Sequence, residues 1–152
     1  MDDSALRALR DRIEIEELMH RYARMVDRRE WSLMHSVFAP GASIDYVSTG
    51  GQAGPYEQVL GWLHRALEPW PLNLHFISNL ELRLEGERGH STCYFHAPMG
   101  RLEPDGSHTI ITNAGYYEDE LVRLEPGWRI ARRHCEQTLR IGRLPEGYVI
   151  PG

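Results

Sequence analysis

The chain has 152 residues, of which 41% are hydrophobic and 26% charged, and this size and composition fit one folded domain rather than a disordered chain. The formal net charge of −5 leaves no basic surface for a nucleic-acid backbone. All 17 basic residues are arginine, which excludes a Schiff-base lysine and the lysine of a phosphate-binding loop.

The sequence also argues against a membrane or secreted location. No stretch approaches the ~18 apolar residues of a membrane-spanning helix, and the N-terminal sequence MDDS is unlike a signal peptide. Cys93 and Cys135 lie far apart without a Cys-x-x-Cys pair, so we expect two reduced, buried thiols. We therefore predict a cytoplasmic protein with a single domain over residues 1–152 and with neither a metal site nor a cofactor.

Three helices are predicted in the first half of the chain. Ser4 is a candidate N-cap of the first, whose apolar stripe continues to Met25. A short second helix covers residues 31–38 and ends at the Pro-Gly pair that follows. The third begins at Pro55 and continues to about Leu67, where two prolines stop it.

Strands dominate the second half. Leu80, Leu82 and Leu84 alternate with charged residues, which is typical of a half-buried strand. One strand precedes the third helix, and three long strand-like runs with short turns between them end the chain: residues 43–48, 90–102, 108–124 and 128–141. Helices followed by an antiparallel meander favour an α+β fold with the helices on one face of the sheet and a pocket at its open end.

Several motifs in this order of elements are similar to those of one family. They are RYARMVD at 21–27, VFAP at 37–40, LHFISN at 74–79, GYYEDEL at 115–121 and GWRI at 127–130. On these motifs the chain resembles the SnoaL-like family of the nuclear-transport-factor-2-like superfamily. The resemblance implies a cone-shaped, cystatin-like α+β barrel, in which a curved mixed or antiparallel sheet is covered on one face by the three helices of the N-terminal half.

The resemblance also implies a set of site residues. In site pattern the chain is nearest to scytalone dehydratase and bile-acid 7α-dehydratase, which implies catalytic roles for Asp27, at the end of the first helix, and for His75 and His96, on neighbouring strands. A further catalytic tyrosine and three substrate contacts are implied at Tyr22, Tyr46, Asn113 and Phe76. Members of this branch are metal-free acid–base enzymes, so no cofactor is expected.

These residue types suit the removal of water from an activated alcohol. The reaction needs a base for the acidified C–H proton, an acid for the departing hydroxyl and donors for the developing enolate oxygen. Histidine, with an ordinary pKa of ~6.5, can do either proton transfer at neutral pH, and a carboxylate beside it fixes its tautomer. We predict a dehydratase in which Asp27 and His75 are the acid–base pair, acting on a mostly apolar, hydroxylated small molecule such as a steroid or polyketide. His96 would be a second proton carrier, and the two tyrosines would be phenol donors.

The alternation of side chains places a condition on this hypothesis. His75 is in phase with Glu81 rather than with the leucines, so an unbroken strand would point it away from the core. An inward His75 requires a β-bulge between about residues 77 and 80, where a Ser-Asn pair would permit one. His96 lies on the strand face opposite Phe95, and the sequence leaves open which of the two faces is inside.

Two other classes of function fit the same residues. One is an isomerase like the ketosteroid isomerases, or a polyketide cyclase, with Asp27 or His75 as the base. The other is a non-catalytic ligand-binding or oligomerisation domain, in which both groups would face water rather than share a closed cavity. In every case, hydrophobic residues that face outward on a large sheet predict a homo-oligomer, either a dimer or a trimer.

Overall fold

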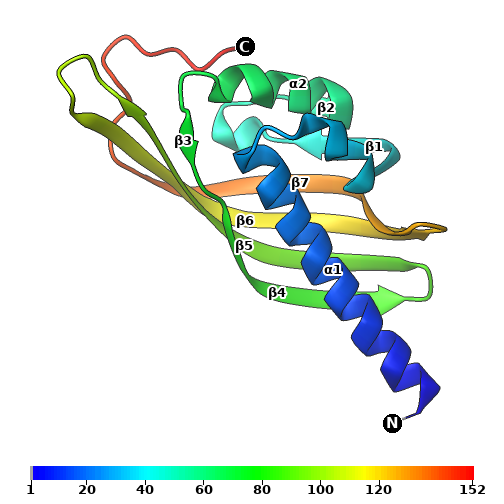
Figure 1. Ribbon diagram of the computed structural model, residues 1–152. Coiled ribbons are helices and arrows are strands. Elements are labelled where there is room, and N and C mark those ends of the chain that lie inside the picture. The colour runs from blue at the N-terminus through cyan, green and yellow to red at the C-terminus, as the bar shows by residue number, and fades with distance from the viewer. Residues whose placement is uncertain (1) are drawn as a thin grey trace.

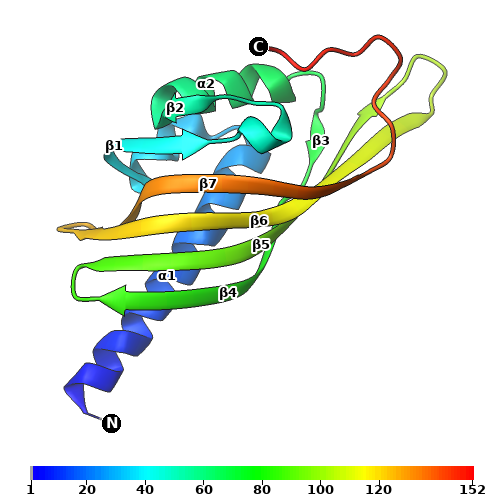
Figure 2. The same ribbon diagram turned by 180° about the vertical axis from the view of Figure 1, so that it is seen from behind.

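A computed structural model describes residues 2–152 as one curved sheet with helices on one of its faces (Figures 1 and 2). The helices are α1 (Asp3–Asp27) and α2 (Tyr56–Leu67), with two 3-10 helices, η1 (Trp31–Ser36) and η2 (Val47–Thr49). The strands are β1 (Phe38–Asp45), β2 (Ala53–Pro55), β3 (Leu72–Asn73), β4 (Phe76–Glu85), β5 (Arg88–Leu102), β6 (His108–Leu124) and β7 (Gly127–Ile141). The predicted α+β class is confirmed.

The sheet is mixed and stays open. Its order is β2-β1-β7-β6-β5-β3, and β4 also pairs with β5. β1 runs parallel to β7, while the long strands β4 to β7 form an antiparallel meander. The long strands curve, and the helices lie over the concave face of the sheet, on which a pocket can form (Figure 1).

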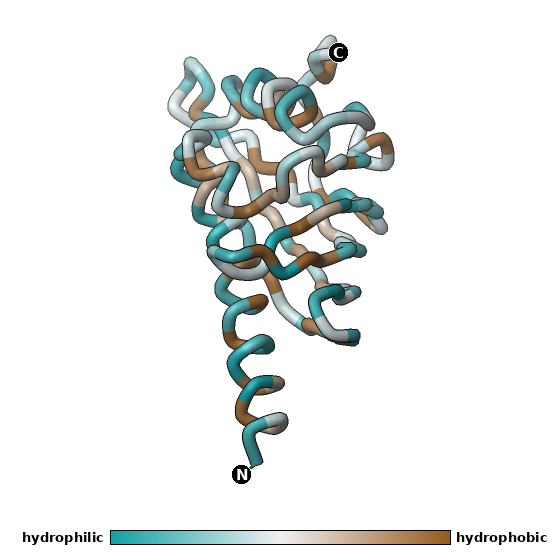
Figure 3. The backbone as a smooth tube through the Cα atoms, turned by 90° about the vertical axis from the view of Figure 1, so that its right-hand side faces the viewer, coloured by the Kyte–Doolittle hydropathy of each residue, from teal (hydrophilic) through white to brown (hydrophobic). Residues whose placement is uncertain are grey.

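The helix α1 packs on the sheet along only part of its length. Its N-cap is Asp2, whose carboxylate accepts a 2.7 Å hydrogen bond from the amide of Ala5, so the expected cap at Ser4 is wrong. The buried apolar residues of this helix begin at Ile15, whereas Ile13 is 54% exposed. The first turns extend beyond the sheet (Figure 3), and the second half of the helix supplies the core and the site.

The first strand begins earlier than the sequence pattern predicts. The helix expected over 31–38 ends at Ser36 as a 3-10 helix, and Phe38 already belongs to β1. A parallel pairing of Phe38 with Ile130 of β7 holds this start in the sheet, and the register then shifts before Ser43. Gly41 has a positive φ of 76° within that shift, so the residues that suggested a helix stop form an irregular strand instead.

The predicted β-bulge is present in β4. Pairing with β5 shifts register between Ser78 and Glu81, and Asn79 adopts the left-handed conformation with φ 55°. One extra residue changes the phase of alternation, so Ile77 and Leu80 both contact the core although they are three residues apart. His75 is thereby turned toward the concave face.

Among residues 2–152, no helix combines the length and apolarity needed to cross a membrane.

Candidate functional site

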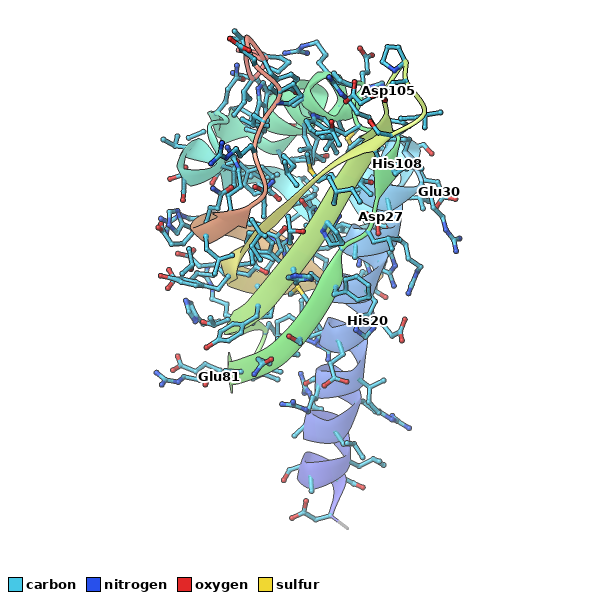
Figure 4. The ribbon with its side chains drawn as sticks, turned by 90° about the vertical axis from the view of Figure 1, so that its left-hand side faces the viewer. His20, Asp27, Glu30, Glu81, Asp105 and His108 are labelled. Carbon is cyan, nitrogen blue, oxygen red and sulfur yellow. The ribbon has the colours of Figure 1, made fainter. Side chains whose placement is uncertain are left out.

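Asp27 and His75 form a hydrogen-bonded pair where the end of α1 meets the chain entering β4. The imidazole Nδ1 lies 2.6 Å from Asp27 Oδ1, and the backbone N–H of His75 donates to Asp27 Oδ2 at 2.8 Å. The side chain of His75 is 11% exposed and that of Asp27 is 16% exposed. Figure 4 labels Asp27 on the last turn of α1, beside the strands. The two-point contact fixes the imidazole ring, and the carboxylate holds the ring proton on Nδ1, so that Nε2 carries the lone pair.

Arg29 fastens the two chain segments that carry this pair. It follows α1 in the left-handed conformation with φ 59°, which turns its side chain back toward the α2–β3 connection. Its guanidinium donates to four oxygens of the surrounding chain at 2.7–3.2 Å: Val26 O, Leu67 O, Trp70 O and Asn73 Oδ1. These hydrogen bonds connect the end of α1 to the segment that leads to His75. Arg29 therefore positions the Asp27–His75 pair but is not part of it.

A cavity of about 100 Å³ lies between α2, the concave face of the sheet and the C-terminal segment. His75 is on its wall, and so are Tyr22, Tyr46 and Asn113. The rest of the lining is mainly apolar and aromatic: Trp62, Leu63, Leu67, Trp70, Phe95, Met99, Ile111, Tyr117, Leu144 and Ile150. A mostly apolar wall with a few convergent polar groups is typical of a small-molecule site.

Three buried tyrosines form the polar part of the cavity beside the sheet. The hydroxyls of Tyr22 and Tyr46 are hydrogen-bonded to each other, and the ring of Tyr117 stacks on Phe95 with centroids 4.7 Å apart. Burial raises the pKa of Tyr22, and it raises the pKa of Tyr46 and of Tyr117 well above the ordinary value of 10.0. The phenols are therefore protonated throughout the neutral range and can donate to an oxygen of a bound molecule.

A buried ion pair supports the tyrosines from the side of β6 and β7. Arg133 donates to both carboxylate oxygens of Asp119, at 2.8 Å and 2.7 Å, and both side chains are fully buried. The guanidinium carbon lies 4.3 Å and 4.1 Å from the ring centroids of Tyr22 and Tyr117. Burial alone would lower the pKa of Arg133, but the Asp119 carboxylate outweighs it and holds that pKa well above its usual range. A fixed positive charge thus lies next to the phenols.

The C-terminal segment closes the cavity opposite the sheet. The indole N–H of Trp62 donates to the carbonyl of Pro151, and that of Trp70 donates to the hydroxyl of Tyr148 at 2.9 Å. Ile150 packs close to the backbone at Gly50, where an added Cβ would lie 2.9 Å from its side chain. Residues 142–152 have almost no regular secondary structure, so the cavity wall on this side depends on these contacts.

His96 and Phe76 do not reach the cavity, so the structure does not support the site roles that the resemblance implies for them. Both side chains are exposed, and they face each other across the β4–β5 pair with ring centroids 6.2 Å apart. The concave face is taken by Phe95 and its alternate neighbours, so His96 points to the convex face. Phe76 follows His75 directly and therefore points the opposite way.

Three polar features of the site are absent from the sequence-based prediction: Tyr117, the Asp119–Arg133 pair, and Arg140 on the cavity wall. Tyr117 and Asp119 alternate in phase with Leu121, and that signal could have placed them inside. Arg133 gives no such signal, because a register shift between Glu120 and Leu121 interrupts the alternation of β7. Among residues 2–152, no three His, Cys, Asp or Glu side chains are grouped so as to hold a metal ion.

Comparison with known proteins identifies the family. The family model for the SnoaL-like domain matches residues 7–134. An uncharacterized protein of Mycobacterium tuberculosis is 32% identical over 123 residues, which cover 81% of this chain and 82% of that protein. The family match begins within α1 and ends in the middle of β7, so it includes the Asp27–His75 pair.

Solved structures share the whole architecture. A type 2 hexachlorocyclohexane dehydrochlorinase aligns with a TM-score of 0.77 at 20% identity, covering 97% of this chain and 99% of that one. A proposed scytalone dehydratase from Novosphingobium aromaticivorans aligns with a TM-score of 0.76 at 16% identity, covering 98% and 99%. At these identities the likeness establishes a common fold, and the resemblance to bile-acid 7α-dehydratase stays a prediction.

Proposed function

Because the chain belongs to the SnoaL-like domain family, we propose that it is a cofactor-independent dehydratase with Asp27 and His75 as its acid–base pair. The observation that carries the proposal is the 2.6 Å contact between Asp27 and His75, whose imidazole lies on the wall of a largely apolar cavity. The side chains of His75 and Asp27 are only 11% and 16% exposed, whereas the alternative of a non-catalytic domain predicts that both groups face water. The substrate is a small hydroxylated molecule with a carbonyl group that acidifies the neighbouring C–H bond.

The proposed reaction is a β-elimination. Nε2 of His75 removes the proton from the carbon next to the carbonyl, and the electron pair moves onto the carbonyl oxygen. One phenol of the Tyr22–Tyr46 pair donates a hydrogen bond to that oxygen while it accepts one from the other phenol. Asp27 stabilises the imidazolium that forms. The enolate then re-forms the carbonyl and a carbon–carbon double bond as the hydroxyl leaves, and the hydroxyl takes the proton from Nε2. The products are the unsaturated ketone and one water molecule.

The size of the cavity favours a small substrate. An engineered cavity of roughly 150 Å³ in another protein accommodates benzene, and the cavity here has about 100 Å³. The cavity is the smaller of the two, so even a single ring requires side chains of the wall to move, and a four-ring steroid would require a much larger displacement of the wall. We propose a monocyclic or short-chain substrate in place of the steroid or polyketide that the resemblance implies.

The names of two structural neighbours support elimination as the reaction class. A dehydrochlorinase removes hydrogen chloride and a dehydratase removes water, and both reactions take a proton from carbon while a group leaves the neighbouring carbon. The proposal for this chain rests on the Asp27–His75 pair, and the shared fold by itself does not assign a reaction.

The test is a mass-spectrometric search for loss of 18 mass units from a panel of small β-hydroxy ketones. We expect wild type to turn over at least one compound, and His75→Gln and Asp27→Asn each to lower the rate by roughly 10²- to 10⁴-fold. His96→Gln is the matched control, because this exposed histidine lies on the other face of the sheet, and it should retain the wild-type rate.

Two results would contradict the proposal. One is a wild-type rate in either His75→Gln or Asp27→Asn. The other is uptake of solvent deuterium into a compound whose double bond moves without loss of water, because the same base would then serve an isomerase.

A further inference from the structure

Arg140 brings one positive charge to the wall of the cavity, on the side away from His75. It lies on β7, and its Nε donates to the side-chain oxygen of Asn113 on β6 at 2.8 Å. A longer 3.4 Å contact joins Nη2 to the side-chain oxygen of Gln137. Both partners are neutral, so they orient the guanidinium but do not offset its charge.

The absence of a carboxylate distinguishes Arg140 from arginines nearby. Arg101, whose guanidinium lies over the ring of the cavity residue Trp70, is paired with Glu103 at 2.7 Å. Arg133 is paired with Asp119. Within the part of the chain that the structure describes, Arg140 has no carboxylate within ion-pair distance, and the cavity lining contains one guanidinium and no acidic side chain. A half-buried cation on an apolar wall is a site for an anion.

The sheet fixes how far this charge lies from the acid–base pair. Phe76 pairs with His96, so His75 lies beside Ala97 of β5; Ala97 pairs with Asn113, and Asn113 pairs with Arg140. Three strand spacings therefore separate the backbones of His75 and Arg140, which is roughly 14 Å. Both side chains extend into the cavity between them, so the two functional groups are closer than their backbones.

We propose that Arg140 binds a carboxylate of the substrate, so that the molecule acted on is a small hydroxy-keto acid. The inference deepens the proposed function and rests on it, since the substrate would span from Arg140 to the base. The planar guanidinium is oriented by Asn113 and Gln137, and its remaining N–H groups can donate to the two carboxylate oxygens. The carboxylate and the reacting carbon then lie a few bonds apart, as a short chain or one ring allows.

The experiment measures binding without requiring turnover. Phenylacetate, 3-phenylpropanoate and 4-phenylbutanoate are titrated calorimetrically, each against its own primary amide. We expect at least one acid to bind wild type about ten-fold more tightly than its amide, since hydrogen bonds to charged groups are the stronger class. Arg140→Gln should reduce this preference to less than two-fold. Arg140→Met, which keeps most of the side-chain length, should do the same if the glutamine variant is poorly folded.

Two controls separate this inference from the catalytic proposal. Arg65→Gln removes an exposed arginine whose guanidinium contacts a carbonyl of its own helix α2, and it should leave the preference unchanged. His75→Gln should also keep the preference, even though it abolishes turnover. The inference is overturned if the preference survives in both Arg140 variants, if it is lost in His75→Gln instead, or if no acid binds with a dissociation constant below ~10 mM.

Discussion

Arg133 and its neighbour Arg132 allow a comparison of two ion pairs on the same two strands. Arg133 pairs with Asp119 on the buried face, and Arg132 pairs with Glu120 on the exposed face at 3.0 Å. Asp119→Asn leaves a fully buried guanidinium without a counter-charge, so we expect it to lower the free energy of unfolding by about 3–5 kcal/mol. Glu120→Gln breaks an exposed pair and should cost less than ~1 kcal/mol.

Urea unfolding of wild type and the two variants measures this difference. Equal losses of stability in Asp119→Asn and Glu120→Gln would show that the buried pair is not held as the structure has it. A variant carrying both Arg133→Met and Asp119→Leu should recover part of the loss, because it removes both charges together.

At the scale of residues, the sequence analysis named the pair and the cavity residues Tyr22, Tyr46 and Asn113, but it missed Tyr117 and Arg133. Asp27 and His75 were predicted from a family resemblance, because nothing in composition or spacing brings residues so far apart in the chain together. Tyr117 carried a signal that was not used, its alternation with Leu121, whereas a register shift in β7 hides the phase of Arg133. His96 was misplaced because both faces of β5 carry aromatic residues.

The bulge in β4 is the local feature on which the orientation of His75 depends. Asn79 adopts φ 55° there, a conformation that asparagine and glycine tolerate and β-branched residues do not. Asn79→Val should therefore lower the free energy of unfolding by about 1–2 kcal/mol and reduce activity through His75. Asn79→Gly is the matched control and should keep both stability and activity within a few tenths of a kcal/mol and two-fold. Similar losses in the two variants would contradict the role of the left-handed residue.

At the scale of elements, periodicity was enough for the meander and not for the start of the sheet. The leucine alternation in β4 predicted the strand, and the bulge followed from the resemblance, which requires an inward His75 against that alternation. The boundary between η1 and β1 was placed late, because the local pattern of residues 31–41 suits a helix and its stop, while the parallel pairing with β7 is a long-range contact. Local sequence carries no record of such a pairing.

The three buried tyrosines set an upper limit to the pH range in which the folded molecule is stable. Burial raises the pKa of Tyr22, Tyr46 and Tyr117, so above pH ~10 the unfolded chain releases protons that the folded chain retains. Stability contributed by these groups is present below pH ~10 and is lost as the pH rises beyond it. We expect their ionisation, followed by absorbance at 295 nm, to coincide with unfolding followed by circular dichroism. Full ionisation of all tyrosines in the folded protein near pH 10 would contradict this expectation.

The convex face of the sheet is the candidate interface of the homo-oligomer, whose existence stays a prediction. Five apolar side chains there are 46–60% exposed: Phe76, Tyr94, Ile110, Leu139 and Ile141. An exposed apolar surface of this kind is typical of an interface between protein chains. Light scattering should give a mass above that of one chain, and Tyr94→Glu should lower it, whereas Ile13→Glu on the exposed part of α1 should not. A monomeric wild type would contradict the prediction.

If Asp27 and His75 act as one acid–base unit, substitutions of the two residues are coupled, and a double-variant cycle measures that coupling. The measurement is kcat/KM for wild type, Asp27→Asn, His75→Gln and the double variant on one substrate. Groups that act as a unit give strongly non-additive losses, so the double variant should lose no more than the more damaged single variant, within about three-fold. Losses that multiply in the double variant, or a single variant with the wild-type value, would contradict the account.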